Sequence, residues 1–291
     1  MIISASRRTD IPRYYAKWFI RRVRAGHCTV PNPFNPGQVR RVDLRPEAVT
    51  ALVFWTRFPK LLMPYIPELE HRKLKFYFQY TITRYPDRYE PGAPPAEEAI
   101  ACFRSLARLL GPGRMIWRYD PIFFTDECDP DDHLQNFARL CAQLQGCTRK
   151  VVISFFDEYR RTRSRMRAAG VAYPGDPLQH PGLKPLLQAM VEIAAHHHLG
   201  IESCAEPEWL QSYGIATGRC IDERLLQSEF GVRVAYKKDP GQRPLCGCMP
   251  SRDIGSNNTC PAGCLYCYAT PNPAQAQERF CRHDVKAESL I

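Results

Sequence analysis

Seven of the thirteen cysteines lie between residues 204 and 267, and this clustering is the strongest chemical signal in the sequence. Three of them, Cys260, Cys264 and Cys267, form a C-x3-C-x2-C pattern with Tyr266 just before the third cysteine. Three thiolates on one short loop can hold three irons of a 4Fe-4S cluster, because sulfur ligands suit iron-sulfur and zinc sites. The fourth iron would have no protein ligand, and catalysis at a metal requires such an open position.

A second set of four cysteines supplies further thiolates at Cys204, Cys220, Cys246 and Cys248. Four thiolates are enough for an auxiliary 4Fe-4S cluster or for a zinc site, and we favour the cluster. The alternative is that Cys204 and Cys220 are buried as small hydrophobic side chains and only the Cys246-Gly-Cys248 pair is special. The other six cysteines occur singly and are predicted to be structural: Cys28, Cys102, Cys128, Cys141, Cys147 and Cys281.

The elements that must position these cysteines alternate between β-rich runs and helix-compatible segments, which predicts an α/β fold with a parallel sheet. The predicted strands cover residues 2–4, 51–56, 75–83, 114–119, 151–156, 200–203 and 232–236. The predicted helices include 13–25, 96–110, 131–145 and 185–198, and the predicted loops are 31–37, 85–95 and 173–182. Seven strands with helices between them favour a (β/α) barrel of TIM type, complete or partial, over residues 1–240. A cysteine-rich, cluster-binding segment, 241–291, would pack on this barrel.

Polar residues follow several predicted strands, at the end where a barrel keeps its active site. They lie at 6–10, 56–57, 79–81, 118–120, 157–158 and 202–204. The alternative is that these strand ends are polar because they meet solvent.

The net charge of +10 could attract nucleic acid, although the excess of arginine is spread along the chain. No apolar run approaches the roughly 18 residues that a membrane-spanning helix needs, and the N-terminus has no signal-peptide pattern. We therefore expect a cytoplasmic protein without membrane contact. No P-loop, G-x-S-x-G, H-E-x-x-H or dinucleotide-binding glycine motif competes with the cysteines.

The stretch from Asn258 to Ala269 resembles the signature of the radical S-adenosylmethionine (SAM) superfamily, most closely that of its spore photoproduct lyase branch. The resemblance implies that the amino and carboxylate groups of SAM chelate the open iron. Reductive cleavage of SAM would then give a 5′-deoxyadenosyl radical, with a flavodoxin or ferredoxin as electron donor. The substrate is not implied.

The position of the motif differs from that in the superfamily, where it normally follows the first barrel strand near the N-terminus. Here only the 24 residues 268–291 follow Cys267. A circular permutation would explain this position. The strand before the motif would come from the segment preceding Cys260, a helix would follow at 274–285, and residue 2 would begin the next strand.

The resemblance also implies residues that hold SAM, and our candidates come from the strand ends. Arg7, Arg8 and Arg118 could bind its carboxylate, because arginine offers a rigid donor fork. Asp120 or Glu158 could accept hydrogen bonds from the ribose, Tyr80 or Tyr266 could pack on the adenine, and Ser4, Ser6 and Thr9 lie where the superfamily binds the SAM amine. The alternatives are a structural Arg118–Asp120 pair and core tyrosines.

The chain also resembles, over nearly its whole length, a bacterial family known as a domain of unknown function (number 1848). The segments that carry this resemblance are 3–12, 32–36, 53–56 and the C-terminal cysteine stretch. Two functions remain open: a radical SAM enzyme, and a non-catalytic zinc or iron-sulfur protein or nucleic-acid-binding module. A radical enzyme that acts on nucleic acid would join the two.

Overall fold

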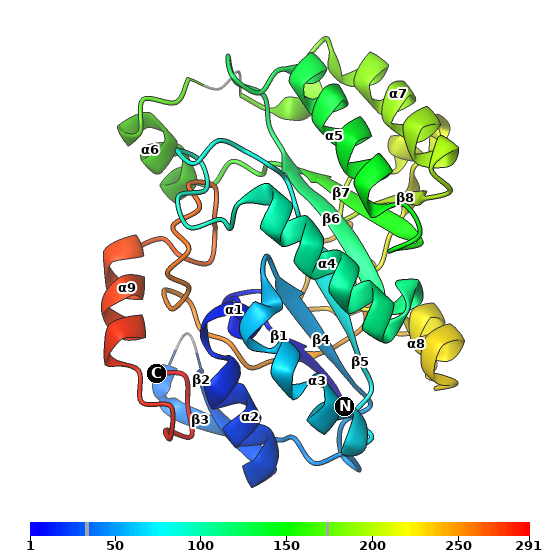
Figure 1. The fold of residues 1–291 in the computed structure, drawn as a ribbon. Helices are drawn as coiled ribbons and strands as arrows, with labels where there is room; N and C mark the ends of the chain where they lie inside the picture. The colour runs from blue at the N-terminus through cyan, green and yellow to red at the C-terminus, as the bar shows by residue number, and fades with distance from the viewer. Residues whose placement is uncertain (33–34, 173–174) are drawn as a thin grey trace.

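The computed structural model describes residues 1–32, 35–172 and 175–291 (Figure 1). Its centre is a sheet in which the described residues form eight strands, in the order β10-β1-β4-β5-β6-β7-β8-β9. Every pair of neighbours in this sheet is parallel. The strands are β1 (Ile2–Ala5), β4 (Ala51–Thr56), β5 (Phe76–Thr81), β6 (Met115–Ile122), β7 (Lys150–Phe155), β8 (Gly200–Ser203), β9 (Ala216–Thr217) and β10 (Arg252–Asp253).

Helices connect these strands, and α4 and α5 pass in front of the sheet in Figure 1. The helices are α1 (Ile11–Tyr14), α2 (Ala16–Ala25), α3 (Ile66–His71), α4 (Ala96–Leu110), α5 (Pro130–Leu144), α6 (Arg160–Ala168), α7 (Leu183–His196), α8 (Glu223–Phe230) and α9 (Pro273–Arg282). An antiparallel pair, β2 (His27–Asn32) and β3 (Asn35–Asp43), lies outside the main sheet. None of the helices in the described ranges combines the length and apolar character needed to cross a membrane.

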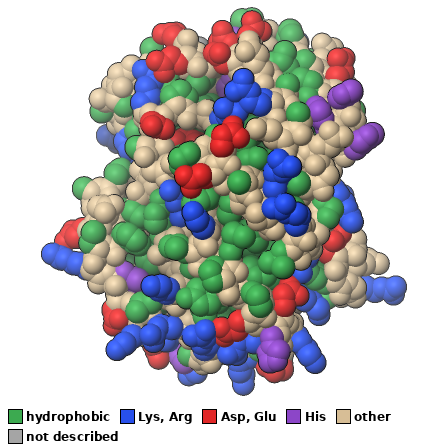
Figure 2. All heavy atoms as spheres, in the orientation of Figure 1, with side chains coloured by type: hydrophobic (Ala, Val, Ile, Leu, Met, Phe, Trp, Pro, Cys, Tyr) green, Lys and Arg blue, Asp and Glu red, His purple; other side chains and the backbone are tan. Residues whose placement is uncertain are grey.

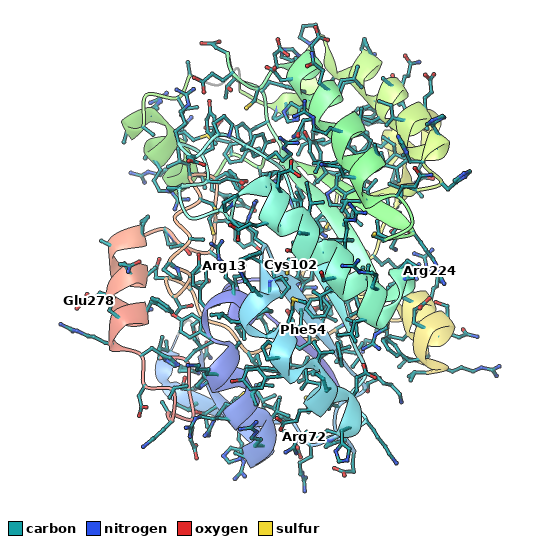
Figure 3. The ribbon with its side chains drawn as sticks, in the orientation of Figure 1. Arg13, Phe54, Arg72, Cys102, Arg224 and Glu278 are labelled. Carbon is teal, nitrogen blue, oxygen red and sulfur yellow. The ribbon has the colours of Figure 1, made fainter. Side chains whose placement is uncertain are left out.

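The two faces of the sheet follow the alternation of side chains along each strand. On β5, Phe76, Phe78 and Tyr80 face the main core with the helices, whereas Tyr77 belongs to a smaller apolar cluster on the other face. Figure 3 shows Phe54 of β4 and Cys102 of α4 within that main core. The smaller cluster is completed by Ile221, Leu225, Leu226 and Met249 from the segment after β9.

The predicted strands 51–56 and 200–203 and the predicted helix 96–110 are confirmed at their bounds. The predicted strand 232–236 is wrong: Val232 and Val234 pack on the smaller apolar cluster without a strand partner. The predicted loop 31–37 is also wrong where it is described, since it falls within β2 and β3. Residues 33–34 of that loop and 173–174 of the predicted loop 173–182 lie outside the described residues.

The α/β class is confirmed, but a TIM barrel is not, because no strand pairing among the described residues closes the sheet. Its two edge strands, β9 and β10, have two residues each. Strands this short offer few backbone N–H and C=O groups for the hydrogen bonds that would pair β9 with β10 and close the sheet.

The strand at the other side of β1 comes from near the end of the chain. Residues Arg252 and Asp253 pair with Ile3 and Ser4, so β10 directly precedes the three-cysteine motif and lies beside the first strand of the chain. Beginning at β10, the strands follow one another across the sheet in the order β10, β1, β4, β5, β6, β7, β8 and β9. The helix predicted after the motif at 274–285 is present as α9.

Candidate metal centre and cavity

A cavity of about 390 Å³ lies where the parallel strands end, and it is lined by residues of β6 and by the segments after β1, β4, β7 and β8. Cavities of a few hundred cubic ångströms hold small ligands in many proteins. All seven clustered cysteines line this one cavity: Cys204, Cys220, Cys246, Cys248, Cys260, Cys264 and Cys267. The two sets that are separate in the sequence therefore share one space.

Asp253 of β10 fixes the start of the loop that leads to the first set. Its carboxylate accepts hydrogen bonds from Ser4 Oγ (2.8 Å), Ser6 Oγ (2.6 Å) and the backbone N–H of Arg7 (2.9 Å). The next backbone turn needs glycine, because a Cβ on Gly255 would lie 2.7 Å from the Cβ of Ser6. The end of β1 and the cysteine loop are thus joined side by side.

The first cysteine of the motif lies against the loop and helix that follow β1. Tyr15 donates a hydrogen bond from its hydroxyl to the carbonyl of Thr259 at 2.6 Å. Burial raises the pKa of Cys260, whereas the backbone N–H groups of Asp10 and Ala262 act in the opposite direction. Burial likewise raises the pKa of Cys264. A cysteine thiol releases its proton when it binds a metal, so a metal at these two positions would have to overcome the raised pKa values.

A buried ion pair supports the motif from the opposite side. Arg57 and Glu90 form a two-point contact at 2.8 and 2.9 Å, and Glu90 also accepts hydrogen bonds from Thr83 (2.7 Å) and Tyr266. Arg57 contacts the Tyr266 hydroxyl as well. Tyr266, the aromatic residue of the motif, is therefore held at its hydroxyl.

The loop that carries Glu90 also contacts the backbone of the motif. Gly92 N–H donates to the carbonyl of Ala262, and Leu265 N–H donates to the carbonyl of Tyr89, each at 2.9 Å. A Cβ on Gly92 would lie 2.9 Å from the Cα of Ala262, so this close approach requires glycine. The predicted loop 85–95 thus acts as a clamp on the motif.

The four cysteines of the second set come from separate segments that converge. Cys204 follows β8, and its sulfur lies 3.3 Å from that of Cys220. The carbonyl of Cys220 accepts hydrogen bonds from Tyr77 (2.7 Å) and Gln79 (2.9 Å), which fix it over the sheet. Hydrogen bonding to Cys220 and the charge of Arg118 lower the pKa of Cys204 to about 7, although burial opposes this. A lowered thiol pKa favours the thiolate that binds metals.

Two arginines stack on one tryptophan beside this set. The guanidinium carbons of Arg7 and Arg118 lie 5.1 and 5.2 Å from the ring of Trp55. Arg118 Nη1 donates to the sulfur of Cys220 at 2.8 Å. Arg7 Nη2 and Trp55 Nε1 are buried and have no hydrogen-bond partner among the described residues.

The candidate SAM-binding residues fall into two groups, those that line the cavity and those that do not. Arg7, Arg8, Arg118, Asp120, Tyr266, Ser6 and Thr9 line the cavity. Arg118 pairs with Asp120, and this charge lowers the pKa of Asp120 despite its burial, so the structural pair that sequence left as an alternative is present. Arg8 pairs with Asp253 at 3.3 Å.

The other candidates lie away from the cavity. Tyr80 is fully buried on the helix side of β5, where its hydroxyl donates to the carbonyl of Ala99 at 3.0 Å, so it is a core tyrosine. Glu158 forms an ion pair with Arg163 at 2.8 Å, and Ser4 is buried against Asp253. The alternation of side chains along the strand could have assigned Tyr80 to the core from the sequence, because Phe76, Phe78 and Tyr80 lie on one face of β5.

Three cavity residues or their partners were not predicted: Trp55, Glu90 and Asp253. Trp55 alternates with the buried Phe54, which places it on the cavity face. No local sequence pattern identifies Glu90 or Asp253 as residues of the site. Both act on residues more than 150 positions away.

Of the six single cysteines, Cys28, Cys102, Cys128 and Cys141 are buried, as expected of structural thiols, whereas Cys147 is partly buried and Cys281 is exposed. In the ranges that the structure describes, no group of three or more His, Cys, Asp or Glu side chains is arranged as a ready-made site for one metal ion.

Fold and site together define an α/β protein with a cysteine-lined cavity at the carboxyl edge of a parallel sheet. A family model described as a domain of unknown function (DUF1848) matches residues 2–269, and the chain belongs to this family. No curated protein and no solved structure matches the chain.

Proposed function

We propose that this protein is a radical SAM enzyme with a 4Fe-4S cluster on Cys260, Cys264 and Cys267. The observation that carries the proposal is the place of this motif: it follows β10, which pairs with β1, and its three cysteines line the cavity at the strand ends. Ligands of parallel α/β sheets bind at this edge. A permuted chain with this strand order would place the motif after the first strand of the sheet.

The residues of the site fit such a cluster in their chemistry. Three cysteine thiols on a loop provide soft ligands for iron and leave one iron open. When bound, the cluster and SAM would supply a 5′-deoxyadenosyl radical that abstracts a hydrogen atom. The chain's own residues would hold the loop: Arg57, Glu90 and Tyr266 fix one side, and Asp253 and Tyr15 fix the other.

The second set fits an auxiliary 4Fe-4S cluster on Cys204, Cys220, Cys246 and Cys248. All four line the same cavity as the motif. Four protein thiolates saturate a cubane cluster, so no iron would remain open for SAM. This difference assigns SAM binding to the three-cysteine loop.

An acidic electron donor, such as a flavodoxin or ferredoxin, fits the surface beside the motif. Arg165 of α6 donates hydrogen bonds to the carbonyls of Cys267 and Thr270, so α6 lies against the cysteine loop. Arg160 and Arg167 of the same helix are exposed. On the face drawn in Figure 2, by contrast, basic side chains are mixed with acidic ones along the lower edge.

The donor surface is tested by the Arg160→Glu/Arg167→Glu variant. We expect weaker, salt-dependent binding of an acidic flavodoxin to this variant than to the unaltered protein. The double variant Arg21→Glu/Arg104→Glu, on α2 and α4, serves as the charge-matched control, because both arginines are exposed. Equal binding of flavodoxin by both variants would contradict the proposal that α6 binds the electron donor. Binding of DNA or RNA in place of flavodoxin would favour a nucleic-acid partner.

The cluster assignment is tested by the iron, labile sulfide and zinc content of anaerobically isolated protein. We expect about eight irons in the unaltered protein and about four in a Cys260/Cys264/Cys267 triple alanine variant, the count for two cubane clusters. Cys281→Ala is the control, because this cysteine is exposed and single. Zinc without sulfide would contradict the proposal and favour the structural metalloprotein.

A further inference from the structure

The two ends of the cavity differ in how their arginines are used. At the three-cysteine end, Arg57 is occupied by Glu90 and Tyr266, and Arg165 by two backbone carbonyls. At the four-cysteine end, Arg7 and Arg118 lie over the same ring, that of Trp55. Stacking holds each guanidinium by its face and does not use its N–H groups. Those of Arg118 donate to Asp120, Gln79 and Cys220.

Arg118 already directs one of its N–H groups at a cysteine sulfur. Its Nη1 donates to Cys220 at 2.8 Å, while its Nε donates to Asp120 at 2.9 Å. The side chain is almost fully buried. A buried guanidinium is thereby shared between a carboxylate and the four-cysteine set.

Arg7 has a donor for which the described protein offers no acceptor. Its Nη2 is buried and without a partner, and so is Trp55 Nε1. Cys248 and Cys220 are the cysteines whose charges act most on Arg7, and the three cysteines of the motif are not among them. A buried donor without a partner destabilises the fold, which indicates that an acceptor belongs at this place.

We propose that Arg7 and Arg118 donate hydrogen bonds to the sulfur atoms of the cluster held by the four cysteines and thereby favour its reduced state. This assignment rests on the auxiliary cluster of the proposed function. Reduction adds one negative charge to a cluster, and nearby cations and hydrogen bonds to its sulfurs stabilise that charge. The two arginines thus make the four-cysteine cluster a better electron acceptor than it would be without them, and four protein thiolates leave no iron open to chelate substrate.

The test is a redox titration of the four-cysteine cluster alone, in the full chain with Cys260, Cys264 and Cys267 replaced by alanine. In this background, Arg7→Met is expected to shift the reduction equilibrium about tenfold toward the oxidised cluster, which is about 59 mV for one electron. Arg7→Lys keeps the positive charge but loses the planar set of guanidinium N–H donors, so the shift in this variant should be smaller than in Arg7→Met. The matched control is Arg8→Met, the neighbouring cation, which pairs with Asp253 and should shift the equilibrium less than about twofold.

The outcomes separate this assignment from the function on which it rests. An iron content of about four with an unchanged potential in Arg7→Met overturns the role of Arg7 and leaves the auxiliary cluster intact. A shift of equal size in Arg8→Met also overturns it, because the effect would then be one of general charge. Absence of iron and sulfide in this background overturns the auxiliary cluster and the assignment together.

Discussion

The two ends of the cavity are both lined by cysteines, but the chain supplies these cysteines in different ways. Cys260, Cys264 and Cys267 come from one loop of eight residues, and long-range contacts from Glu90 and Gly92 hold this loop in place. The other set comes from the end of β8, the segment after β9 and a C-x-C pair further along. One end is local in sequence and supported by tertiary contacts, whereas the other exists only through the fold.

This difference teaches that the two ends should fail in different ways. A change in the motif removes ligands but leaves the sheet intact. A change in the second set disturbs the cover of the smaller apolar cluster, because Cys220, Cys246 and Cys248 belong to that cluster. Ligand loss and loss of packing are therefore coupled only at the four-cysteine end.

The largest expected effect comes from removing single cysteines. Cys264→Ala should abolish reductive SAM cleavage and keep about four irons, whereas Cys246→Ala should remove about four irons and keep SAM cleavage measurable. The measurement is methionine or 5′-deoxyadenosine formed per protein, with iron content beside it. Loss of all iron in both variants would show that the two ends assemble as one unit.

The buried ion pair tests the support of the three-cysteine end. Glu90→Gln leaves Arg57 without its buried anion, so we expect a loss of about 3–5 kcal/mol in the free energy of unfolding. Denaturant unfolding measures it. Glu68→Gln is the control, because Glu68 pairs with arginines at the surface. If Glu90→Gln and the unaltered protein are equally stable, the ion pair does not stabilise the three-cysteine end.

Acid should weaken the same end through a buried histidine. His133 bonds Tyr119 and the carbonyl of Phe123, whose ring lies 5.7 Å from that of Tyr266, and burial lowers the pKa of His133 to about 4. The folded protein thus keeps His133 neutral. The contribution of this neutral histidine to the free energy of unfolding is fully present above pH ~6.5, the pKa of a histidine in the unfolded chain. As the pH falls from there toward 4, the free energy of unfolding should fall by up to about 3 kcal/mol.

The variant His133→Asn should flatten this pH dependence, measured as denaturant unfolding at a series of pH values. The same substitution at the exposed His196 is the control and should leave the slope as it is in the unaltered protein. A slope that His133→Asn does not change would assign the acid response to other groups.

The smallest expected effect tests the clamp. Gly92→Ala would place a Cβ 2.4 Å from the carbonyl oxygen of Ala262. The backbone of the motif must then move away, at about 1–3 kcal/mol, and we expect a lower iron content at the three-cysteine end. Gly200→Ala is the control, since its Cβ would meet its neighbours at an ordinary 3.7 Å. An iron loss from the four-cysteine end instead would contradict the separation of the two ends.

Much of the sheet could be predicted from the sequence because its central strands are long apolar runs. The β4 run Ala51–Thr56 and the helix Ala96–Leu110 carry clear patterns of length and period. A strand was expected in the segment preceding Cys260, but the bounds of β10 could not be predicted, because Arg-Asp has no apolar run and forms a strand only by pairing with Ile3 and Ser4. An open sheet and a barrel share the same alternation of strands and helices, so the sequence pattern could not separate them.

For the site, spacing and clustering alone found the cysteines, but not the groups that orient them. The motif is contiguous, so its chemistry can be recognised in one stretch. Tyr80 was placed in the site because it stands at the end of a strand, yet its register puts it with Phe76 and Phe78. The pairing of Glu90 with Arg57 depends on the path of a proline-rich loop, and no local pattern records that path.

The pairing of β10 with β1 has a consequence for synthesis on the ribosome. The outer neighbour of β1 is β10 at residues 252–253, so this edge of β1 stays unpaired until those residues have been made. An unpaired strand edge is open to association with other chains. The three cysteines of the motif follow β10 in the chain, so a chain truncated before residue 250 lacks both the motif and the strand that covers this edge of β1.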